Sequence, residues 1–317
     1  MLIYIKPLSV FPELHSDRLF GAIFSAISEL YPEKLNEIIE NFEDNNPPFI
    51  ISSTFPAIKI GDETIRFFPK VIINNSSNNS FNLDDLKDFK KVEYYEENIF
   101  FDIINGKLSE NDILNNYHNY HRINNLLMIK NHDVNIKVKE VILPNNMVNR
   151  VSGETKIFYS GGLRFNENFV LFFFIEVFNK EYELLIKSAL KFLKDRGFGH
   201  DISIGKGQFD YKIENLSIND LSNNEIIHDN DKFITLSRFI PSENDLKFID
   251  EHSDYELLSK RSKDKSGETR KQVRFFKEGS TFKNYAKYYG RIVKSGYIKP
   301  AIEYGFAFPL NYTLKGD

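Results

Sequence analysis

The spacing of apolar residues predicts an amphipathic helix near the start of the chain. Apolar positions recur at intervals of one, three and four residues from Leu19 to Leu30, which is the stripe of a helix. Ser16 and Asp17 supply N-cap chemistry just before this stripe, and Pro32 stops the helix soon after it. The pattern therefore predicts a helix that begins close to Ser16 and ends before Pro32.

A second helical stripe and five apolar runs complete a recognisable order. The second helix covers Glu181 to Arg196, and Gly197 follows it where a glycine commonly ends a helix. The apolar runs predict strands at Met1–Leu8, Phe49–Ser53, Thr64–Ile73, Asn168–Phe178 and Gln208–Ile213. With one strand more, this succession resembles the strand, helix, strand, strand, helix, strand order of a ferredoxin-like, split βαβ domain.

The rest of the chain is divided into an insertion, a linker and a second unit. Residues 74–126 form a polar insertion, in which Leu83–Phe89 and Asp112–Leu126 resemble helices. Residues 216–231 are polar again and resemble a linker. We therefore predict an α+β protein with two ferredoxin-like (RRM-like) domains, at 1–225 and 226–317, with a projecting hairpin at about 144–162. In the second domain, strands are expected at Lys232–Ile240, Glu256–Arg261, Lys271–Lys277 and Tyr304–Leu310.

Composition supports a sheet-rich protein and excludes several kinds of chemistry. The 317 residues include 30 Phe and 16 Tyr, which suit a pleated and half-buried surface. The absence of Cys excludes disulfides, Cys-ligated zinc, iron–sulfur clusters and thiol catalysis. The N-terminus does not resemble a secretory signal, and Phe169–Phe178 has about half the length of a membrane-spanning helix. We expect a cytoplasmic protein that does not enter a membrane.

Charge is distributed unevenly along the chain. The formal net charge is −4, yet the stretch from Arg261 to Lys299 holds twelve Lys or Arg against three acidic residues. A cationic surface of this size favours contact with phosphates. Within it, Arg270, Lys271 and Arg274 alternate with aromatic residues, as in single-stranded RNA surfaces. The alternative is a solvated strand pair whose aromatic side chains belong to the core.

The glycine-rich segment 197–207 is the most informative motif. Its four glycines, Gly197, Gly199, Gly205 and Gly207, permit positive φ angles and a close approach of another chain. Exposed amides, Ser203 and Lys206 would then face a phosphate backbone. The spacing is neither a Walker A motif nor a dinucleotide fingerprint. A hairpin that merely closes the domain explains the same composition equally well.

Two weaker motifs also favour anion binding. A helix N-terminus attracts anions, and His15 and Arg18 add donors there, although Ser16 and Asp17 are ordinary caps. Asn149-Arg150 lies in a polar stretch that predicts a hairpin. No metal site is predicted, because His118 and His121 lack a third ligand. No paired carboxylates or nucleophile motif indicate catalysis.

Several blocks, in the same order along nearly the whole chain, resemble the RAMP superfamily of CRISPR-associated proteins. The glycine-rich segment resembles the loop of that superfamily. The other blocks resemble the fourth subunit of Csm-type (type III-A) effector complexes. These blocks are His15–Ala22, Pro48–Ser53, Phe55-Pro56, Phe68–Lys70, Asn149–Gly153, Leu236–Pro241 and Lys277–Ser280. Arg18 departs from a Thr that is common in the family, and residues 74–126 have no counterpart.

The resemblance implies a structural, non-catalytic subunit without cofactor or metal. Such a subunit binds the single-stranded 5′ tag of CRISPR RNA and links the large polymerase-like subunit to the backbone RAMP subunits in antiviral defence. The residues that the resemblance and the motifs assign to RNA are His15, Ser16, Asp17, Arg18, Asn149, Arg150, Gly197, Phe198, Gly199, His200, Ser203, Gly205, Lys206, Gly207, Arg238, Arg270, Lys271 and Arg274.

Two alternatives to this function remain open at the level of sequence. One is a metal-independent endoribonuclease that processes precursor CRISPR RNA, in which His15 or His200 would act as general base. The other is a protein-interaction module, in which the glycine-rich loop contacts a neighbouring subunit instead of RNA.

Overall fold

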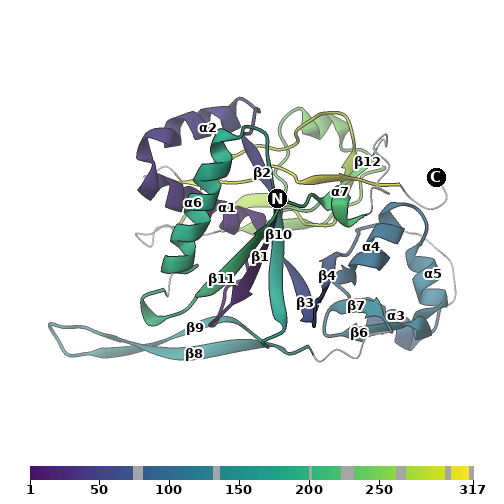
Figure 1. Ribbon diagram of the computed structural model, residues 1–317, viewed down its shortest axis with the longest axis horizontal. Coiled ribbons are helices and arrows are strands. Elements are labelled where there is room, and N and C mark those ends of the chain that lie inside the picture. The colour runs from purple at the N-terminus through teal and green to yellow at the C-terminus, as the bar shows by residue number, and fades with distance from the viewer. Residues whose placement is uncertain are drawn as a thin grey trace.

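The N-terminal part has the predicted split βαβ arrangement (Figure 1). The computed structural model describes residues 1–73, 81–130, 136–199, 202–222, 232–261, 269–296 and 301–313. Four strands lie in the order β11-β1-β10-β3, and every neighbouring pair is antiparallel. The two crossing helices are α1 and α6. These elements are β1 (Leu2–Pro7), α1 (Ser16–Leu30), β3 (Phe55–Ile60), β10 (Phe169–Val177), α6 (Glu181–Arg196) and β11 (Phe209–Glu214).

Strand β10 is the centre of the molecule. Its residues from Phe169 to Ile175 are all buried. It pairs with β1 on one side and with β2 (Phe49–Ile51) and β3 on the other. Because successive side chains of a strand point to opposite faces, both faces of this strand must be covered. Helices α1 and α6 lie together beside the sheet (Figure 1).

The main hydrophobic core joins the two halves of the chain. The ring of Phe20 in α1 stacks on Tyr304 with ring centroids 4.6 Å apart, and Phe174 in β10 lies 6.0 Å from Phe308. Buried residues of both halves belong to one contiguous cluster. Burial of apolar surface therefore couples the C-terminal half to the N-terminal sheet.

The insertion extends the sheet beyond β4 (Glu63–Pro69). Strands β5 (Tyr94–Glu96), β7 (Leu126–Ile129) and β6 (Tyr120–Ile123) add to its edge and bring the sheet to nine strands. Helices α3 (Leu83–Phe89), α4 (Glu97–Ile104) and α5 (Glu110–Asn115) accompany them. The predicted helix at Leu83–Phe89 is confirmed.

The predicted helix at Asp112–Leu126 is wrong beyond Asn115. The chain forms the hairpin β6–β7 instead, and Asn124 at its turn has a left-handed φ of 55°. The physical reason is local, because an Asn-Asn pair between two apolar and aromatic runs favours a hairpin turn over a continued helix. Arg122 donates to the carbonyl of Asn124 and fixes this turn.

A long hairpin projects from the body of the molecule (Figure 1). It consists of β8 (Val138–Val148) and β9 (Thr155–Phe165), so the hairpin predicted at about 144–162 is confirmed and longer than expected. Two short helices complete the N-terminal part, α2 (Leu35–Glu43) and α7 (Ile218–Leu221).

The described residues of the C-terminal half form small antiparallel sheets and a 3₁₀ helix, Asp245–Phe248. The division of the chain into two domains near residue 225 stays a prediction. Within the described ranges, no helix is long and apolar enough to cross a membrane. The strands of this half are β12 (Lys232–Thr235), β13 (Leu257–Lys260), β14 (Val273–Phe276), β15 (Thr281–Lys283), β16 (Val293–Lys294), β17 (Ile302–Glu303) and β18 (Pro309–Asn311).

Candidate nucleic-acid interface

Helix α1 begins with a cap supplied from a distant segment. The amide of Ser16 donates to Oγ of Ser53 over 2.9 Å, which satisfies one of the free amides of the first turn. His15 precedes the helix in extended backbone and makes no side-chain cap. The expectation that Ser16 and Asp17 act as N-caps is therefore wrong. Their side chains are engaged with the C-terminal half instead.

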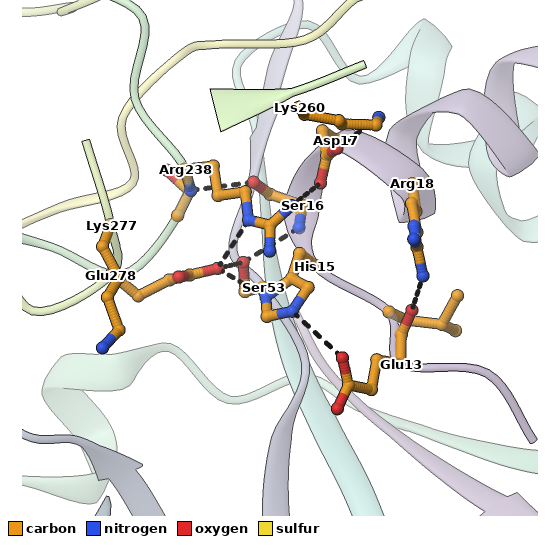
Figure 2. Close-up of polar contacts among 12 residues, drawn as sticks. Glu13, His15, Ser16, Asp17, Arg18, Ser53, Arg238, Lys260, Lys277 and Glu278 are labelled. Carbon is orange, nitrogen blue, oxygen red and sulfur yellow. Dashed lines mark hydrogen bonds and ion pairs between the residues drawn. The ribbon is translucent and has the colours of Figure 1, made fainter. Parts of the chain in front are cut away.

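Asp17 is the centre of a buried charged network between the two halves (Figure 2). Its Oδ2 accepts from Nζ of Lys260 over 2.5 Å, and its Oδ1 lies 3.4 Å from Nη1 of Arg238. Lys260 and Arg270 also pair with Glu303, at 2.8 and 3.2 Å. Burial alone would raise the pKa of Asp17, but Lys260 and Arg238 hold it below its usual value.

His15 belongs to another part of this network, which is centred on Glu278. Its Nδ1 donates to Oε1 of Glu278 over 2.8 Å, and Oγ of Ser53 donates to the same oxygen over 2.5 Å. Burial alone would lower the pKa of His15, but the hydrogen bonds to Glu13 and Glu278 raise it to about 9. Burial would likewise raise the pKa of Glu278, yet His15 and Arg238 lower it to about 2. His15 is therefore a cation at neutral pH.

This ion pair gives a testable pH dependence. The folded state raises the pKa of His15 from 6.5 to about 9, so the stability that its protonation contributes is fully present below pH 6.5. That contribution is lost as the pH rises through about 9. We expect the free energy of unfolding in urea to fall over this window and His15→Gln, which cannot titrate, to flatten the fall. Equal slopes in the two proteins would contradict the pairing.

A cleft of about 660 Å³ opens beside His15. Phe55 and Phe169 of the central sheet line it, as do residues at the base of the β8–β9 hairpin. Residues of the charged network and of the insertion also line it. Its lining combines basic donors for phosphate and a ring for stacking with five carboxylates, those of Glu13, Glu93, Glu110, Glu256 and Glu278. The donors and the ring belong to His15, Lys70, Lys90, Tyr94, Arg238 and Lys277.

The glycine-rich segment is closed at its base. The amide of Phe198 donates to the carbonyl of Gly207, and the amide of Gly207 donates to the carbonyl of Val10, both over 2.9 Å. The ring of Phe198 is buried and stacks on Phe209 with centroids 4.6 Å apart. All four glycines have positive φ, as predicted: Gly197, Gly199, Gly205 and Gly207. The domain-closing explanation therefore accounts for the base of the loop.

The middle of the loop differs from its base. Gly199 and Gly205 are exposed, so the backbone there can be reached from solvent. Lys206 is buried, and its ammonium group contacts Oγ of Ser160 in β9. The expectation that Lys206 is exposed to phosphate is therefore wrong. His200 and the side chain of Ser203 lie outside the described residues.

The other predicted residues are separate from the cleft wall. Oδ1 of Asn149 accepts from the amides of Val151 and Ser152 at the hairpin tip, so Asn149 shapes the turn. Arg150 is exposed at this tip, which stands clear of the body (Figure 1). Arg18 is exposed and donates to the carbonyl of Glu13.

The basic segment agrees in part with the alternative explanation, in which charged side chains face solvent and aromatic side chains belong to the core. Lys271 and Arg274 are exposed, whereas Arg270 pairs with Glu303. Phe275 of the same segment is fully buried in the core. At least part of the aromatic pattern therefore serves packing.

Sequence reasoning missed the partners that hold the network together. Ser53 and Glu278 lie within blocks that carried the resemblance, which was a signal for both, but the hydrogen bonds of Glu278 to His15 and Ser53 cross more than 200 residues. Lys260 and Glu303 gave no local signal. Lys70 also lay in such a block, whereas Lys90 and Tyr94 lay in the unassigned insertion.

Comparison with known proteins decides the fold. No protein family and no curated protein matches the sequence. A chain from the crystal structure of the Csm3–Csm4 subcomplex in the type III-A CRISPR-Cas interference complex is similar, with a TM-score of 0.71 and 20% identity. The match covers 98% of this chain and 99% of that chain. A chain from the Csm1–Csm4 cassette in complex with pppApA matches with a TM-score of 0.56 and 20% identity, over 100% of this chain and 99% of that one.

A third structure, the Csm1–Csm4 cassette in complex with cA4, also contains a similar chain. Its chain matches with a TM-score of 0.55 and 19% identity, over 99% of this chain and 98% of that chain. Csm4 is the subunit common to the three complexes. The chain has a Csm4-like fold. The predicted α+β fold is thereby confirmed, and the likeness spans the insertion as well as the blocks that suggested it.

Proposed function

We propose that this chain is a non-catalytic, RNA-binding subunit of a type III-A CRISPR effector complex. It binds the single-stranded 5′ tag of CRISPR RNA and links the large polymerase-like subunit to the backbone RAMP subunits in the cytoplasm. The likeness to chains of Csm3–Csm4 and Csm1–Csm4 complexes over the full length supports this position between two kinds of partner.

The observation that carries the RNA-binding proposal is the cleft. Three cationic groups from three segments, His15, Lys90 and Arg238, line a space that also presents the ring of Tyr94. A strand of RNA placed there would meet donors for its phosphates and a surface for stacking a base. The glycine-rich loop contacts the hairpin through Lys206 and Ser160, and residues at the base of the hairpin line the cleft.

A structural role is favoured over endoribonuclease activity by the state of His15. A general base must be unprotonated at the working pH. Glu278 holds His15 protonated at neutral pH and occupies its Nδ1. Incubation of the protein with labelled repeat RNA tests this argument, because clean cleavage that His15→Ala or His200→Ala abolishes would favour the enzyme. Absence of any RNA binding would favour the protein-interaction module.

Lys90 provides a sharp test of phosphate contact in the cleft. Its side chain is exposed and has no ion pair among the described residues. We expect Lys90→Gln to lower the slope of log affinity against log salt by about 0.7, the value of one single-strand phosphate contact. Fluorescence anisotropy with the tag RNA measures the slope.

The matched control is Lys191→Gln. Lys191 is an exposed lysine of α6 that does not line the cleft. Its loss changes the net charge equally and should leave the slope unchanged. An equal effect of the two substitutions would show that the RNA is held by overall charge, and would remove the cleft from the proposal.

A further inference from the structure

Backbone hydrogen bonds tie the insertion residues that line the cleft to the main sheet. The carbonyl of Asn125 accepts from the amides of Glu93 and Tyr94, over 2.9 and 3.1 Å. Strand β5 pairs with β7 through Tyr94 and Leu126, and this joins these residues to the main sheet. Less backbone has to be ordered when a ligand binds to a segment held in this way, which lowers the cost of binding.

Tyr94 presents its side chain to the cleft from the insertion. The ring is partly buried and lines the cleft, and among the described residues it has no aromatic neighbour within stacking distance and its hydroxyl has no hydrogen-bond partner. Its neighbour Tyr95 is buried and does not line the cleft, and its hydroxyl donates to Glu110. Burial and the nearby carboxylates of Glu278 and Glu93 raise the pKa of Tyr94, so the phenol stays neutral.

Beside Tyr94 the insertion carries hydrogen-bond acceptors. Nδ2 of Asn125 donates to Oε2 of Glu93 over 2.6 Å, which fixes the carboxylate against the turn. A carboxylate has about four lone-pair sites, so Glu93 can accept further donors. Both residues line the cleft. Carboxylates on proteins recognise amino groups of bases, as when they accept from N4 of cytosine.

The charged network also lines the cleft. Its His15 and Arg238 pair with Glu278, and Nε of Arg238, which makes no hydrogen bond among the described residues, lies 3.7 Å from Oε1 of that carboxylate. A nucleotide in the cleft would place its phosphate by His15 and Arg238 and its base by Tyr94. A cleft of about 660 Å³ lies in the size range of sites that hold small ligands, roughly 300–1,000 Å³.

We propose that the insertion, through Tyr94, Glu93 and Asn125, holds one extruded base of the bound RNA and selects a base with an exocyclic amino group. Adenine, cytosine and guanine qualify, and uracil does not. This inference rests on the proposed function and adds a base-selective subsite to it. It also gives the insertion a role in specificity.

The test uses the full-length protein and tag RNAs in which a single abasic site is moved along the strand. At one position, the abasic site is expected to weaken binding by about 5- to 150-fold, the range of one stacked base. Tyr94→Leu should abolish this sensitivity, whereas Tyr94→Phe should retain it. Tyr211→Leu, in a partly exposed tyrosine of β11 outside the cleft, is the matched control. At the sensitive position, uridine should bind several-fold more weakly than adenosine or cytidine, and Glu93→Gln should level this difference.

The outcomes separate the inference from the function on which it rests. If the unaltered protein binds no tag RNA, the proposed function fails. If it binds but no abasic position is sensitive, or the sensitivity survives in Tyr94→Leu, the base subsite is overturned while RNA binding stands. Equal binding of uridine and adenosine at the sensitive position overturns the selection for an amino group.

Discussion

Asp17→Asn is expected to lower the free energy of unfolding by about 3–5 kcal/mol, because removing one partner of a buried ion pair leaves uncompensated charge. The Asp17 side chain is fully buried between Lys260 and Arg238. Asparagine has nearly the same shape, so the substitution removes charge while leaving the packing almost unchanged. The loss should be visible as a lower midpoint in urea with an unaltered m-value.

The matched control for this prediction is Glu29→Gln. Glu29 pairs with Arg196 on the surface, where both side chains are about 40% exposed. Exposed pairs contribute about 0–1 kcal/mol, so this control should change stability little. Equal losses in the two variants would show that the network around Asp17 is not a buried electrostatic link. The prediction therefore also tests whether the two halves unfold as one unit.

Gly207→Ala is the second large expected effect. Gly207 has a φ of 71°, and a Cβ there would lie 1.8 Å from the carbonyl oxygen of Phe198. The left-handed backbone costs about 1–2 kcal/mol in a residue with a side chain. Overpacking adds about 1–3 kcal/mol. We expect a loss of about 2–5 kcal/mol in unfolding free energy, measured by chemical denaturation.

Gly205→Ala separates the two contributions. Gly205 has a φ of 82°, but a Cβ there would have open space around it. It should lose only the backbone term of about 1–2 kcal/mol. If Gly207→Ala proves no worse than Gly205→Ala, the base of the loop is looser than its hydrogen bonds to Phe198 and Val10 indicate.

Local patterns were sufficient for much of the fold. The helices α1 and α6 and the strand β10 follow from apolar spacing over 9 to 16 residues, because their amphipathic stripes or continuous apolar runs are properties of contiguous sequence. The insertion was harder. Its strands are 3 or 4 residues long, and such short runs carry too few positions to distinguish a strand from a helix.

For the site, too, local features could be predicted from sequence and long-range contacts could not. By itself the sequence determined helices α1 and α6, strand β10, the positive φ angles of the glycine-rich loop and the existence of the hairpin, since each depends on neighbouring residues. Only the tertiary structure decided that Asp17 pairs with Lys260 and His15 with Glu278. It also decided that Lys206 is buried and that Tyr94 lines the cleft. Ion pairs and cleft walls join residues tens to hundreds of positions apart, and a buried charge acquires its partner only when packing excludes water around both.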